Sequence, residues 1–87
     1  MEEHTNVLKH YCDRLREELS DVETYGNLYE VLMSQGMRED AEVIEEIAED
    51  ELSHAMALYK LLEIHHHEID TETKARYHKA RAMFHLS

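Results

Sequence analysis

The 87-residue chain contains no proline, no tryptophan, two glycines and one cysteine. A single cysteine excludes an intrachain disulfide framework and any four-thiolate metal or iron–sulfur site built by one chain. No apolar run approaches the roughly 20 residues that cross a bilayer. We therefore expect no membrane span, and the acidic first residues lead us to expect neither a signal peptide nor a basic targeting segment. These absences make the cytoplasm the expected location.

Basic residues are also scarce. Nine Lys and Arg stand against 20 Asp and Glu, which gives a formal net charge of −11. This balance argues against nucleic acid as the main partner, because binding phosphates needs positive charge. It suits a protein that attracts cations.

The residues that are abundant, Glu, Leu, Ala, Arg and Met, are strong helix formers. Gly36 follows a periodic segment and predicts a helix end, and Asp70 followed by Thr71 predicts a helix start. We therefore predict an all-α protein with helices over 5–35, 37–69 and 71–86.

The chain divides by charge as well. Residues 1–70, the predicted antiparallel helical hairpin, carry 5 basic and 19 acidic groups, whereas the short C-terminal helix over 71–87 is basic. We expect that helix to dock on the acidic hairpin or on a neighbouring chain. A loosely packed terminal helix is the alternative.

Each long helix has an apolar face that ionisable residues interrupt near its middle. In the first helix the face comprises Leu8, Tyr11, Leu15, Glu18, Val22, Tyr25, Tyr29 and Leu32, flanked by Cys12, Leu19, Gly26 and Met33. In the second it comprises Met37, Ile44, Ile47, Glu51, His54, Leu58 and Leu61, flanked by Ala41, Ala48, Ala55 and Leu62. Charged side chains are rarely buried unless they are paired or bind a metal. Glu18, Glu51 and His54 are therefore the candidate metal ligands.

The positions of these residues along the hairpin support that interpretation. Glu18 precedes Gly36 by 18 residues and His54 follows it by 18. Both therefore lie about 27 Å from the turn, and Glu51 lies one helical turn from His54. Glu23, another acidic residue of the first helix, lies roughly 140° around the helix from Glu18 and is not expected at the site.

Two long helices alone leave exposed apolar stripes, and pairing with a second copy in a four-helix bundle would bury them. The centre of such a homodimer holds two copies each of Glu18, Glu51 and His54. One Glu from each of two helices and a Glu-x-x-His pair from each of the other two form the ligand set of di-iron and di-manganese carboxylate bundles. We therefore expect two iron ions per dimer, and manganese or zinc also suits these ligands.

The sequence resembles the ferritin-like superfamily, and specifically the first half of a rubrerythrin. The resemblance runs from Leu15 to Leu58 and rests on Glu18, Tyr25, the Gly36 turn, and Glu51-Leu52-Ser53-His54 followed by Ala55. It implies that Glu18 is a terminal ligand, that Glu51 bridges two metals and that His54 binds one of them. It also implies that Tyr25 lies near the oxygen side of the metals.

The departures from rubrerythrins concern organisation. Rubrerythrins fold two such helix pairs from one chain, and this chain has one. In that respect it is similar to encapsulated ferritins, which share their site across a dimer, although no Gly-rich cargo tail follows Phe84. No Cys-x-x-Cys rubredoxin module is present either. The resemblance thus implies a ferroxidase-type or rubrerythrin-like oxidoreductase that oxidises Fe(II) with oxygen or peroxide, and it favours iron oxidation over peroxide reduction.

Other interpretations remain open at this point. The central polar residues also fit a structural network that fixes register in a coiled-coil dimer, or a zinc-loaded bundle without turnover. A third alternative is an interaction module whose basic C-terminal helix docks a larger partner, and assembly beyond a dimer is left open. Tyr25 also suits core packing, and Cys12 suits a small buried apolar position. His65, His66 and His67 fit either metal capture or a solvated helix end.

Overall fold

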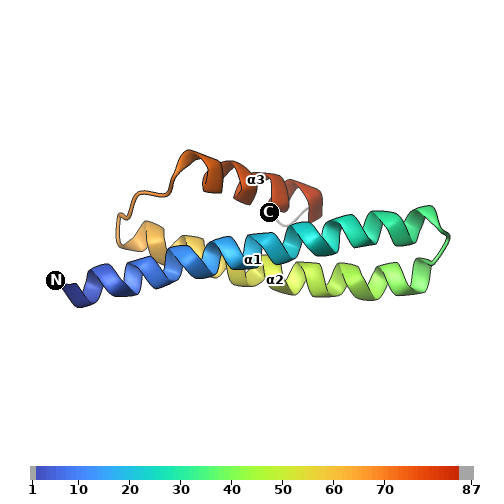
Figure 1. Ribbon diagram of the computed structural model, residues 1–87, viewed down its shortest axis with the longest axis horizontal. Coiled ribbons are helices and arrows are strands. Elements are labelled where there is room, and N and C mark those ends of the chain that lie inside the picture. Colours follow the sequence, from blue (N-terminus) through green and yellow to red (C-terminus); the bar gives the residue numbers. More distant parts are fainter. Residues whose placement is uncertain (1, 85–87) are drawn as a thin grey trace.

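The computed structural model describes residues 2–84 and the side chains of residues 6–84. It contains three helices, α1 (Glu2–Ser34), α2 (Arg38–Ile64) and α3 (Thr71–Phe84). Figure 1 shows α1 and α2 as an antiparallel hairpin, with α3 beside it and running back toward the turn. The all-α prediction is confirmed. Within the described part, no helix has the length and apolar character to span a membrane.

Two expectations concern the C-terminus. The predicted end of the third helix at residue 86 and the expected absence of a cargo tail after Phe84 both lie outside the described residues.

The hairpin turn forms where Gly36 predicts it. Gly36 has a φ of 74°, in the left-handed region that favours glycine. Its N–H donates to Met33 O at 3.1 Å, and the N–H of Met37 donates to Leu32 O at 2.9 Å. These two bonds satisfy carbonyls at the end of α1 in a Schellman motif, which stops the helix and reverses the chain.

The end of α2 differs from the prediction of a helix up to residue 69. The helix ends at Ile64, because His66 adopts a φ of 51° and closes a second Schellman motif. The N–H groups of His66 and His67 donate to Glu63 O and Leu62 O, each at 2.9 Å. The three histidines therefore form the exposed C-terminal cap of α2 and the start of the connection to α3, which fits the interpretation as a solvated helix end.

Asp70 starts α3, as predicted. Its carboxylate accepts the N–H of Thr73 at 3.0 Å and the hydroxyl of Thr73 at 2.7 Å. This cap satisfies one of the free N–H groups in the first turn of the helix. An ion pair with Arg16 at 3.3 Å also joins Asp70 to α1.

The described part of α3 docks on the hairpin, which confirms the first of the two expectations for the basic tail. Arg76 donates two hydrogen bonds to Glu23, at 2.8 and 3.0 Å. Tyr77 is buried and stacks on Tyr59 of α2 with 3.9 Å between ring centroids. Where the end of α3 approaches α1, Gly26 makes room for Met83, whose sulfur would lie 2.6 Å from an added Cβ.

The hydrophobic core lies between the facing sides of α1 and α2. The fully buried members of its main cluster are Leu15, Leu19, Val22, Ala48, Leu52, Ala55 and Leu62. In α2 the predicted flanking residues are therefore the buried ones, whereas most of the predicted stripe is only half-buried. A single hairpin buries only the sides that its two helices turn toward each other, and this leaves the neighbouring stripe open.

The hairpin consequently has two unlike grooves. The covered groove lies under α3 and is marked by Ser20, Glu23 and Tyr59. The open groove lies on the other side of the core, since Glu23 and Tyr59 are each roughly 140° around their helices from Glu18 and His54, respectively. The open groove is lined by half-buried apolar side chains, namely Tyr11, Tyr25, Leu32, Ile44, Ile47, Leu58 and Leu61.

Candidate metal centre

The middle of the open groove holds a cluster of two carboxylates and one imidazole. Glu18 of α1 and Glu51 and His54 of α2 each offer one ligand atom, and these atoms all lie within 4.8 Å of one another. The antiparallel turn at Gly36 places the two helices so that residues at equal distances from it meet. The structure thus brings together the three residues that the sequence singles out as candidate ligands.

Glu18 is the buried member of the cluster, with 4% of its side chain exposed. Its Oε1 accepts a hydrogen bond from Arg14, one helical turn earlier. Its Oε2 is fully buried and has no hydrogen-bond partner. The Nδ1 atom of His54 lies 3.6 Å from Oε2, which is beyond ordinary hydrogen-bond distance. An acceptor left in this state costs free energy, which a cation bound at this oxygen would offset.

Glu51 lies one turn before His54 and is half-buried. The neighbouring Glu18 carboxyl raises the pKa of Glu51, because a protonated Glu51 can hydrogen-bond to it whereas two carboxylates repel each other. Partial burial raises this pKa further, and His54 and Asp21 act in the opposite direction. The site therefore concentrates negative charge that the chain's own groups only partly compensate.

His54 completes the cluster from the solvent side. Its side chain is 62% exposed, so in a single chain it does not have the interior position that the apolar stripe suggests. Two carboxylate oxygens and an imidazole nitrogen are ligands that suit iron, manganese or zinc. Because Oε2 of Glu18 is also unpartnered, the residues present fit a divalent metal ion.

Tyr25 is the fourth residue that the resemblance singles out. It lies on the open groove, half-buried and packed against the hydrophobic core. Two turns of α1, or about 10 Å, separate it from Glu18 along the helix axis. The packing fits the core interpretation of Tyr25, and a role near bound oxygen stays a prediction.

Two neighbours of the cluster were not singled out from the sequence. Arg14 bonds to both Glu17 and Glu18, and Asp21 lies close enough to Glu51 to lower its pKa. The spacing of Arg14 and Glu18, four residues apart on a helix, is the signal that could have found the first pair. Glu23, excluded from the site by its angle around the helix, indeed faces α3.

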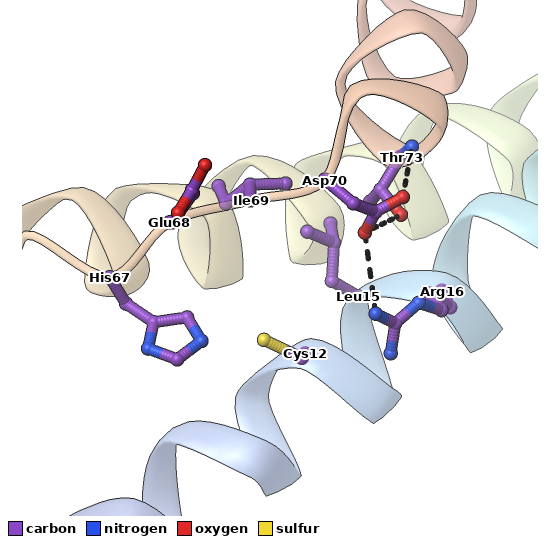
Figure 2. A pocket seen from close by; sticks show the side chains of 8 residues that line it. All are labelled: Cys12, Leu15, Arg16, His67, Glu68, Ile69, Asp70 and Thr73. Carbon is purple, nitrogen blue, oxygen red and sulfur yellow. Dashed lines mark hydrogen bonds and ion pairs between the residues drawn. The ribbon is translucent and has the colours of Figure 1, made fainter.

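A second polar region surrounds Cys12, away from the cluster. Figure 2 shows the Cys12 sulfur turned toward the His67 ring across a small cavity. The cavity is about 140 Å³ and is also lined by Arg16, Asp70 and Thr73, which bind one another. Burial raises the pKa of the Cys12 thiol, so the thiol stays protonated near neutral pH. Cys12 is half-buried, and it packs against the core much as predicted.

A helical hairpin with a Glu and a Glu-x-x-His cluster at mid-length is typical of ferritin-like carboxylate proteins. Comparison with protein families matches residues 13–85 to rubrerythrin. The chain belongs to the rubrerythrin family, whose members usually bind iron. No curated protein and no solved structure matches the chain in the other two comparisons.

Proposed function

We propose that two copies of this chain pair through their open grooves, hold two iron ions between them and oxidise Fe(II) with oxygen or peroxide. The observation that carries the proposal is the buried Oε2 of Glu18, which has no partner and faces Glu51 and His54. Burying a carboxylate beside a second one is costly unless a cation compensates both. A metal ion at this point satisfies all three side chains at once.

The composition of the cluster supports the pairing. One chain supplies one Glu from α1 and one Glu-x-x-His pair from α2, which is half of the ligand set of a di-iron carboxylate bundle. A second copy related by two-fold symmetry supplies the other half. Four carboxylates then balance the charge of two divalent ions.

The surroundings of the cluster support the pairing as well. The open groove combines half-buried apolar side chains with the exposed apolar residues Leu28 and Val43. Such a surface is costly to leave in water, and a second hairpin is the simplest element of matching length to cover it. Because α3 docks on the other side of the core, it leaves this groove free.

In the paired site the chain's residues bind and position the metal. Glu18, Glu51 and His54 of each copy would hold the two ions, in the roles that the resemblance implies for them. Iron bound there supplies electrons singly, and two Fe(II) ions supply the two that reduce oxygen to hydrogen peroxide or peroxide to water. The half-buried Tyr25 lies in the open groove, on the side of the cluster toward the hairpin turn.

The experiment is an anaerobic titration of metal-free protein with Fe(II), followed by admission of air while near-ultraviolet absorbance is recorded. We expect saturation near one iron per chain and a new ferric band after air enters. Glu51→Ala is the matched variant, and it should take up no stoichiometric iron. Iron that binds but stays ferrous in air would contradict the oxidase function and favour a non-catalytic metal-binding or structural dimer.

A further inference from the structure

We propose that Arg14 is a positioning residue, which neutralises Glu18 in the metal-free protein and competes with the metal ion for that carboxylate. The inference rests on the proposed metal site and adds a residue that controls its affinity. It follows from the contacts of Arg14, from the unequal surroundings of the two Glu18 oxygens, and from the exposure of the three side chains involved.

The guanidinium of Arg14 forms a fork between two carboxylates of α1. One nitrogen, Nη1, donates to Glu17, and the other, Nη2, donates to Oε1 of Glu18. The side chains of Arg14 and Glu17 are 56% and 61% exposed, whereas that of Glu18 is 4% exposed. Arg14 thus reaches from the surface to the one buried carboxylate of the cluster.

This contact makes the two oxygens of Glu18 unequal. Oε1 accepts the hydrogen bond from the Arg14 guanidinium. Oε2 has no hydrogen bond and lies 3.6 Å from Nδ1 of His54. Arg14 therefore determines which oxygen is available to a metal ion. It also supplies positive charge, which a buried carboxylate beside Glu51 needs when no metal is bound.

The same charge opposes metal binding. A divalent ion on Oε2 and a guanidinium on Oε1 share one carboxyl group, so they lie within a few ångströms and repel. Coulomb's law makes that repulsion equivalent to about a tenfold loss of affinity even at the dielectric constant of water.

The test compares Arg14→Gln and Arg14→Lys with the unchanged protein. Calorimetric titration with Mn(II) avoids oxidation in air, and thermal unfolding of the metal-free proteins is the second readout. We expect Arg14→Gln to bind Mn(II) about tenfold more tightly and to unfold at a lower temperature without metal, since Glu18 then lacks its cation. Arg14→Lys keeps the charge and should behave like the unchanged protein.

Arg16→Gln is the matched control, because Arg16 pairs with Asp13 and Asp70 and has no contact with the cluster. It should leave Mn(II) affinity unchanged. If the unchanged protein binds Mn(II) and Arg14→Gln binds it equally or more weakly, the role of Arg14 is overturned and the metal site stands. If none of these proteins binds Mn(II), the metal site itself is overturned, and the role of Arg14 with it.

Discussion

The two grooves of the hairpin are built from the same two helices and are finished in different ways. In the covered groove side chains of α3 meet partners on the hairpin: Arg76 binds Glu23 and Ser20, and Tyr77 stacks on Tyr59. In the open groove the central Glu18 has an unpartnered oxygen, and the apolar side chains around it remain half-buried. The first groove is completed within the chain, whereas we propose that a metal ion and a second copy complete the other.

The covered groove serves the stability of the chain, and we propose that the open groove serves its function. The described part of α3 acts as an intramolecular cover that extends the core through Tyr77, Ala80 and Phe84. The open groove keeps costly features, two adjacent carboxylates and exposed apolar surface, that a protein designed only to fold would avoid. Substitutions in the covered groove should therefore lower the stability of the fold, whereas substitutions in the open groove should weaken metal binding and pairing.

The largest effect should come from placing a charge in the open groove. Ile47 is half-buried one turn from Glu51, and Ile47→Lys puts an ammonium into the proposed interface. We expect dimer affinity to fall by at least ~100-fold, since a buried unpaired charge costs several kcal/mol, and metal binding to fall with it. Sedimentation measures the first and Mn(II) titration the second.

Val31→Lys is the control for that change. Val31 is 49% exposed and lies about 140° around α1 from Glu18, away from the open groove. It should leave both measurements unchanged. Equal behaviour of the two variants would show that the open groove is not the interface.

A smaller effect of a different kind should follow from loosening the covered groove. Arg76→Ala removes the two bonds to Glu23 and the bond to Ser20. Because this pair is partly exposed, we expect the free energy of unfolding to fall by about 1 kcal/mol or less. Denaturant unfolding measures the loss, and the Mn(II) affinity should not change. A clear loss of metal binding in this variant would contradict the division of roles between the grooves.

The smallest effect should be a pH dependence at the start of α3. Hydrogen bonds from the Thr73 side chain and backbone, and then Arg16, lower the pKa of Asp70 below its usual value of 3.8. The contribution of its charge to stability is therefore present above about pH 4 and is lost as the pH falls through the lowered pKa. Asp70→Asn keeps the cap but removes the charge. The stability difference between the two proteins should be constant near neutral pH and disappear under acid conditions; a difference that grows in acid would be inconsistent with this origin.

Much of this arrangement is visible in the sequence. Gly36 and Asp70 mark backbone positions whose chemistry is local, so the hairpin turn and the start of α3 could be predicted. The meeting of Glu18 with Glu51 and His54 follows from helix geometry once the turn is placed. These predictions needed only periodicity, spacing and residue type.

The remaining features depend on tertiary contacts, which the periodicity of the sequence does not reveal. The stripe of α2 and its flank are both apolar, and only the approach of α1 decides that Ala48 and Leu62 of the flank are buried while Ile47 of the stripe is half-buried. The early end of α2 requires a histidine, His66, in a conformation that usually marks glycine. Tyr77 becomes an anchor of α3 because Tyr59 lies opposite it, a pairing set by tertiary structure.

The most direct test of a metal site shared by two chains is native mass spectrometry of the protein loaded with Mn(II). The account predicts a species with the mass of two chains that carries two metal ions, and loss of both ions together in Glu51→Ala. A single chain that retains its own ion, or a two-chain species without metal, would contradict the claim that the open groove is completed by a second copy.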